Sequence, residues 1–124
     1  MHEDITKFIE AYRDSVSHGP RALTAFYAEP CVTASTAAVR VSPASDDTAL
    51  VLAEVHAANR ARGFTHVELR AVDIHPLGSS SALATVRWAY KGACDELLWT
   101  TTISYNLYRR DGVWKILVQT IHDM

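Results

Sequence analysis

The stretch TISYNLYRRDGVWKILV, residues 102–118, decides the fold of this chain. Apolar and polar residues alternate through its first half, and an alternating segment follows the Asp111-Gly112 pair. An Asp-Gly pair between two such segments is the strongest short-range signal of a β-hairpin. The C-terminal part of the chain is therefore predicted to form two long antiparallel strands joined by a tight turn.

The same period-two alternation extends the predicted sheet backwards from this hairpin. Long strands are expected at residues 65–74, 81–91, 97–109 and 113–121. Turn-forming residues separate them, so sequential antiparallel pairing is the simplest topology. The alternation slips near residues 71–73, which predicts a β-bulge that bends the sheet.

The first half of the chain has a helical period. Its predicted elements are a helix over 3–17, a short helix over 21–27, two short strands or an irregular hairpin at 31–36 and 38–42, and a helix from Ser45 to the region of Gly63. Gly19-Pro20 ends the first helix, and Ser45 is the expected N-cap of the last. The order predicts a single α+β domain over residues 1–124, with three helices packed on one face of a strongly curved, mainly antiparallel sheet.

The amino-acid composition indicates which kinds of partner this protein is not expected to bind. The apolar fraction is 48% and the net charge is −2, values typical of a soluble globular protein and without the basic patch that nucleic-acid binding requires. The opening MHEDITK lacks the apolar core of a signal peptide, and no apolar run is long enough for a membrane span. We expect a cytoplasmic protein with no nucleic-acid or membrane partner, in which Cys31 and Cys94 are buried free thiols.

The order of elements, with a last hairpin reading YNLYRRDGVWKI at residues 105–116, resembles the nuclear transport factor 2-like superfamily over essentially the whole chain. That superfamily includes ketosteroid isomerases, scytalone dehydratase, polyketide cyclases and non-catalytic association domains. The resemblance implies a cystatin-like cone in the order α-α-β-β-α-β-β-β-β, closest to the polyketide cyclase and ketosteroid isomerase-like branch.

A partner is expected on the outer side of this sheet. Three helices can cover only one face, and the strand over 81–91 is fully polar on neither face. Relatives of this fold usually form dimers through the sheet, so the resemblance implies a homodimer, with Arg87 as a candidate member of an interfacial ion pair.

The cone is expected to hold a small apolar ligand between the first helix, the third helix and the inner positions of the last strands. Its catalytic candidates are His122, His56 and Tyr12, and its other pocket candidates are Trp99, Tyr105, Tyr27 and Asn59. Each also has a structural interpretation: the tyrosines and tryptophans as core residues, and His56 as a histidine bonded to a backbone carbonyl.

Resemblance to ketosteroid isomerases implies a role for Tyr12, but the carboxylates that those enzymes also need are missing from this sequence. Tyr12 lies seven residues before Gly19, where those enzymes carry the phenol that donates to a developing oxyanion. No carboxylate occupies residues 33–35 or 104–106, which match their base and second acid, so steroid-type isomerisation is not expected. His122 shares an alternation face with Trp114, and relatives often place a histidine near this strand end, within the cone.

Asp73 and His75 share a strand face, where they form either a pair resembling a dehydratase dyad or part of an exposed rim. No metal-binding motif, nucleophile elbow or nucleotide-binding glycine loop occurs, so we expect neither a cofactor nor a metal. A nuclear transport carrier is the weakest interpretation, since nothing in the sequence identifies a nuclear partner, and two functions remain open. One is cofactor-independent proton-transfer chemistry on a small molecule (dehydration, isomerisation or cyclisation), and the other is a non-catalytic dimerisation or association module with a packed cone.

Overall fold

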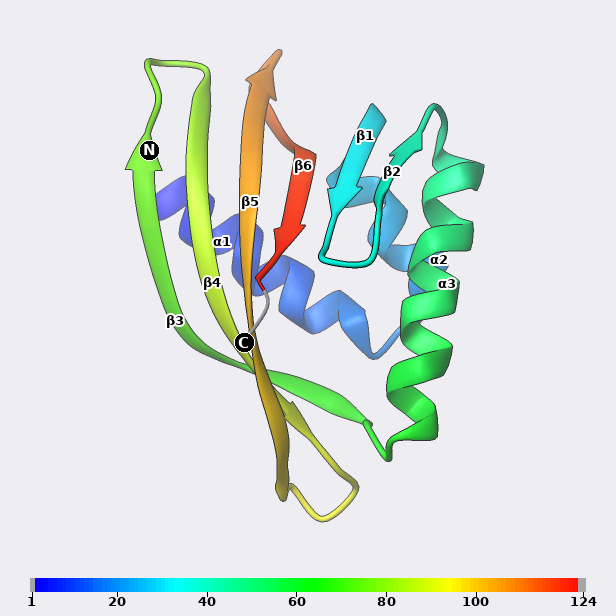
Figure 1. The fold of residues 1–124 in the computed structure, drawn as a ribbon. Coiled ribbons are helices and arrows are strands. Elements are labelled where there is room, and N and C mark those ends of the chain that lie inside the picture. Colours follow the sequence, from blue (N-terminus) through cyan, green and yellow to red (C-terminus); the bar gives the residue numbers. More distant parts are fainter. Residues whose placement is uncertain (1, 123–124) are drawn as a thin grey trace.

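The computed structural model describes residues 2–122. Its helices are α1 (His2–Val16), α2 (Pro20–Leu23), the 3₁₀ helix η1 (Thr24–Phe26) and α3 (Ser45–Ala61). Its strands are β1 (Tyr27–Ala34), β2 (Val39–Ser42), β3 (His66–Pro76), β4 (Ser81–Lys91), β5 (Leu97–Arg110) and β6 (Val113–Ile121). They form one six-stranded sheet in the order β2-β1-β6-β5-β4-β3 (Figure 1). The predicted α+β class and order of elements are confirmed.

The four long strands pair sequentially and antiparallel, as predicted. The β5–β6 turn has a positive φ at both Asp111 (53°) and Gly112 (78°), the backbone that a two-residue hairpin turn of matching twist requires. The strand β1 then extends the sheet by running parallel to β6, and β2 folds back antiparallel on β1.

A bulge bends the sheet where the alternation slips. The register of β3 against β4 shifts between Leu69 and Ala71, immediately before the predicted position. Figure 1 shows β3 curving across the end of the sheet toward α3. A bulge increases the local twist of a strand, and the curvature here leaves room between α3 and the inner face of the sheet.

Two predictions about helix ends are corrected. The second helix changes at Leu23 to the 3₁₀ helix η1, which ends at Phe26, so only Tyr27 of the predicted range is not helical: it begins β1, where it pairs with Ile116 of β6. The N-cap of α3 is Ala44, not Ser45: the Ala44 amide donates to the Asp47 carboxylate at 3.2 Å, while the Ser45 hydroxyl donates to Glu29. The C-terminal end of α3 lies as predicted, with Gly63 at a φ of 93° just beyond it.

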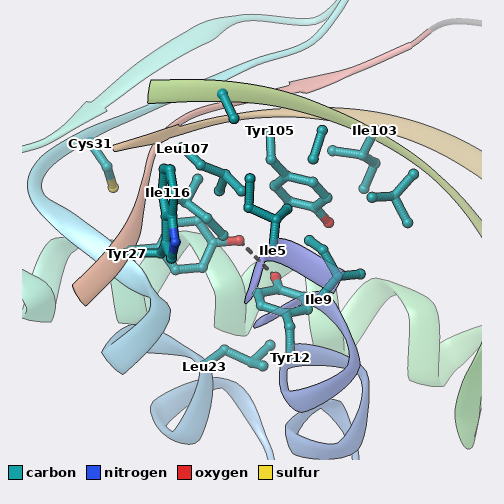
Figure 2. Close-up of a cluster of buried hydrophobic side chains, with 14 of the residues drawn as sticks. Ile5, Ile9, Tyr12, Leu23, Tyr27, Cys31, Ile103, Tyr105, Leu107 and Ile116 are labelled. Atoms are coloured by element: carbon teal, nitrogen blue, oxygen red, sulfur yellow. Dashed lines mark hydrogen bonds between the residues drawn. The ribbon is translucent and has the colours of Figure 1, made fainter. Parts of the chain in front are cut away.

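The core lies between α1 and the inner face of the sheet. Ile5 and Ile9 of α1 are 0% and 1% exposed, and they pack with Leu107 and Ile116 of the last hairpin (Figure 2). Figure 1 shows α1 crossing behind the sheet, and no helix of residues 2–122 covers the near, outer face. None of the helices in this range has the length and apolar character that a membrane crossing needs.

The two cysteines differ in environment. Cys31 is buried, with its sulfur 3.3 Å from the Thr48 hydroxyl. Cys94 is exposed in the β4–β5 connection, which corrects the expectation that both thiols are buried.

Candidate functional site

A cavity of about 230 Å³ lies between α1, α3 and the inner face of β4, β5 and β6. Five of the seven predicted site residues line it: Tyr12, His56, Asn59, Trp99 and Tyr105. The other two, Tyr27 and His122, do not. The lining is buried at Tyr12 and Tyr105 and exposed at Arg62, so the cavity opens beside the C-terminal end of α3.

The helical period of α3 and the alternation of side chains along β5 explain why several residues face the cavity. Leu52, His56 and Asn59 recur at spacings of four and three along α3, so they share the face that meets the cavity. Trp99 and Tyr105 stand at odd positions of β5 and face the same side, because side chains alternate along a strand.

A chain of hydrogen bonds crosses the buried end of the cavity. The Tyr12 and Tyr27 hydroxyls are 2.7 Å apart (Figure 2), and Tyr27 donates to the side-chain oxygen of Gln119 at 2.9 Å. The Gln119 amide nitrogen is oriented toward Thr33 at 3.3 Å. Since the single proton of Tyr27 goes to Gln119, Tyr12 donates its own proton to Tyr27. The Tyr12 hydroxyl is thus satisfied by the core and has no proton left for a ligand.

Tyr105 differs from the other two phenols. Trp88 donates its indole N–H to the Tyr105 hydroxyl at 3.0 Å, and an indole nitrogen can only donate. Tyr105 is therefore the acceptor in this bond, and its own proton is directed toward the Tyr12 hydroxyl, a contact that raises the pKa of Tyr105 and lowers that of Tyr12. The side chain is 1% exposed and lines the cavity. A bound molecule accepts a hydrogen bond from this hydroxyl only by replacing Tyr12 as its acceptor.

Burial keeps these phenols protonated. It raises the pKa values of Tyr12, Tyr27 and Tyr105 well above the usual value for tyrosine, and neighbouring phenols add to the effect. Burial also raises the pKa of Tyr90 to about 12. The cluster can thus donate hydrogen bonds near neutral pH but cannot act as a base.

Aromatic rings form the open end of the cavity. Tyr90 and Trp99 stack with centroids 4.7 Å apart and an interplanar angle of 8°. The Arg62 guanidinium lies 3.7 Å from the centroid of Trp99. Phe64 contacts both Tyr90 and the His56 ring, at centroid distances of 5.4 and 6.0 Å. No hydrogen bond within residues 2–122 involves the His56 imidazole, so it is not tied to a backbone carbonyl there.

The predicted placement of His122 within the cone is wrong. Leu107 pairs with Ile116 but Asn106 pairs with Val118, so Leu117 is an extra residue in β6. Beyond such a bulge every side chain changes face. His122 consequently lies on the outer face, exposed, with Nε2 2.7 Å from the Ser104 hydroxyl.

The same bulge turns Gln119 inward, and sequence reasoning missed that residue. Gln119 is 5% exposed and faces Tyr105 across the β5–β6 ladder. In the sequence it alternates with Lys115 and Leu117, a pattern that assigns it to the opposite face from Trp114. Only the register of β6 against β5 reveals its position.

Asp73 and His75 do form a pair, at 3.3 Å, but their side chains are 74% and 64% exposed. They belong to the rim of the sheet and not to the cavity. Within residues 2–122, no three His, Cys, Asp or Glu side chains are grouped in a way that could hold a metal ion.

Comparisons with known proteins agree with this architecture. The family described as "NTF2-like protein (DUF6841)" matches residues 2–124. No curated protein sequence matches the chain. Among solved structures, an NTF2-like protein of unknown function from Shewanella oneidensis superposes with a TM-score of 0.77 at 17% identity, covering 98% of each chain.

Two further solved structures superpose on this chain about equally well. A putative calcium/calmodulin-dependent protein kinase II association domain from Xanthomonas campestris has a TM-score of 0.75 at 12% identity, over 100% of this chain and 88% of its own. An NTF2-like protein with a cystatin-like fold from Novosphingobium aromaticivorans has a TM-score of 0.75 at 16% identity, over 97% and 79%. At these identities the likeness establishes the fold alone.

Proposed function

The chain belongs to the NTF2-like protein family (DUF6841), and on this premise we propose that it binds a compact, largely apolar small molecule inside the cone. The observation that carries the proposal is the cavity itself, whose mainly apolar and aromatic lining includes the polar groups of His56, Asn59 and Tyr105. Apolar walls with a few convergent polar groups are typical of small-molecule sites.

The size of the cavity restricts the ligand. Its volume of about 230 Å³ is below the roughly 300–1,000 Å³ of sites that hold drug-sized molecules. The ligand is therefore the size of a one- or two-ring compound. The apolar side chains Leu52 and Ile103 favour a hydrophobic body.

Proton-transfer chemistry is the reaction class that these residues support best. A neutral phenol in a dry site stabilises negative charge that develops on an oxygen, as in enolate formation next to a carbonyl. His56 lines the same cavity without a partner in the described chain and is the candidate general base. Among residues 2–122 no carboxylate lines the cavity, so the proposed dehydration, isomerisation or cyclisation, which we propose to be cofactor-independent, proceeds without an acid pair.

Titration with a panel of one- and two-ring ketones, followed by protein-detected NMR, tests the proposal. We expect binding that shifts the indole N–H signal of Trp88, which contacts Tyr105, and that weakens in Tyr105→Phe. Tyr108→Phe is the matched control, since it removes a phenol from the same strand outside the cavity. Absence of binding at millimolar concentrations, or equal loss in both variants, would contradict ligand binding at this site.

A non-catalytic association module is the second candidate. Two observations favour it: the core includes the fully buried Ile5 and Leu107, and the similar X. campestris structure is described as a putative association domain. Loss of every ligand signal in the titration, with self-association retained, would favour this function over the first.

We also propose that a second copy of the chain covers the outer face of the sheet. Thr85, Ser104 and His122 form a hydrogen-bonded row there, with distances of 2.9 and 2.7 Å, and no helix of the described chain lies over them. Short, mutually bonded polar side chains leave a flat surface on which a copy of the same sheet can pack.

A further inference from the structure

Arg62 is the cationic residue of the cavity mouth. It follows the last residue of α3 and lines the cavity, with its guanidinium 3.7 Å above the centroid of Trp99. Trp99 is held from its other side by the stacked ring of Tyr90. A guanidinium lying on a supported aromatic ring has its orientation restricted, while the N–H groups in its plane remain free to donate.

The charge of Arg62 is not neutralised by the protein. Arg62 forms no ion pair with a carboxylate in residues 2–122, and no carboxylate lines the cavity. His56, the other basic side chain among the lining residues, brings no negative charge. A ligand that enters this mouth therefore meets a positive potential next to an apolar wall.

Stabilisation of the C-terminal end of α3 does not by itself explain why Arg62 lies at the cavity. A cation at the C-terminal end of a helix is stabilised by the helix dipole, but Arg60 supplies a charge at the same end of α3 without lining the cavity. What distinguishes Arg62 is its position over Trp99, at the boundary between the cavity and solvent.

Resting on the proposed ligand-binding function, we propose that the ligand is a compact apolar carboxylate whose carboxylate group binds Arg62 at the mouth of the cavity. Guanidinium N–H groups bind carboxylates through paired, charge-assisted hydrogen bonds. The apolar body then lies against the aromatic and aliphatic lining of the cavity. Arg62 is thus a specificity-determining residue for anionic over neutral ligands.

Calorimetric titration with 2-naphthoate and 2-naphthamide tests this assignment, because the two probes share a ring system and differ in charge. In the unaltered protein we expect 2-naphthoate to bind about tenfold more tightly, with an affinity that falls as sodium chloride is raised. Arg62→Gln is expected to remove the preference by weakening 2-naphthoate alone. Arg60→Gln, the matched control on the same helix, is expected to keep it.

The possible failures can be told apart. If both probes bind the unaltered protein equally, or Arg62→Gln weakens both equally, the carboxylate assignment is overturned while the binding function stands. If neither probe binds and the ketone panel also fails, the proposed function is overturned and the assignment with it. Thermal unfolding of each variant shows whether any loss of binding reflects loss of the fold.

Discussion

The indole nitrogen of Trp88 donates to the Tyr105 hydroxyl at 3.0 Å, across neighbouring strands of the sheet. Both side chains are buried, at 2% and 1% exposure. The bond fixes Tyr105 as the acceptor from Trp88, while the proton of Tyr105 is directed toward Tyr12 at the wall of the cavity. One hydrogen bond therefore links the stability of the sheet to the polarity of the candidate site.

Replacing Tyr105 by Phe should reduce the free energy of unfolding by about 1–3 kcal/mol, because the buried Trp88 N–H loses its acceptor. Urea unfolding measures the change. Tyr108→Phe, on the opposite face of β5, should cost less than about 0.5 kcal/mol. Equal stability of Tyr105→Phe and the unaltered protein would show that Trp88 does not depend on this hydroxyl.

Gln119 and Tyr27 should be energetically coupled. Gln119→Leu leaves the Tyr27 proton without its acceptor, whereas Tyr27→Phe removes that proton. We expect Gln119→Leu alone to cost roughly 1–3 kcal/mol, and the double variant to cost less than the sum of the two single variants. A double-mutant cycle in urea measures the coupling, and strictly additive costs would contradict the direction assigned to this hydrogen bond.

Stability should fall steeply at alkaline pH. Unfolded tyrosines ionise near pH 10, but burial raises the pKa of Tyr90 to about 12 and those of Tyr12, Tyr27 and Tyr105 well above the usual value. Above about pH 10 the folded state therefore holds more protons than the unfolded state, so the stability that is fully present below that pH is lost as pH rises toward 12 and beyond. Unfolding free energies between about pH 9 and pH 12 measure the loss.

The Tyr90→Phe variant is the control for this pH dependence, and it should show a shallower decline because one of the four shifted groups is absent. Phenolate absorbance in the near ultraviolet should rise together with unfolding. Full ionisation of the tyrosines at about pH 10 in a protein that remains folded would contradict their burial.

A large charged residue on the outer face should disrupt the proposed dimer. Ser104→Arg places a long cation in the row formed with Thr85 and His122, where a second copy would bring the same charge opposite. Light scattering coupled to gel filtration should then detect monomers. Ala53→Arg, on an exposed position of α3, should leave the dimer intact. A monomeric unaltered protein would refute the dimer directly.

Local sequence signals account for most of the fold. The Asp111-Gly112 pair predicts the last hairpin because few other residues tolerate positive φ at both turn positions. The helical spacing that leads to His56 and Asn59 also predicts which face of α3 meets the cavity. These features depend on backbone preferences and on a period that the chain carries locally.

Tertiary structure alone decided what the last strand presents to the cavity. The extra residue Leu117 is recognisable only once β5 and β6 are paired, and it places Gln119 inside and His122 outside. The parallel contact of β1 with β6 likewise brings Tyr27 to Gln119 from 92 residues away in the chain. Alternation by itself cannot report a one-residue bulge or a distant partner, because both depend on hydrogen bonds between strands and not on the sequence of either strand alone.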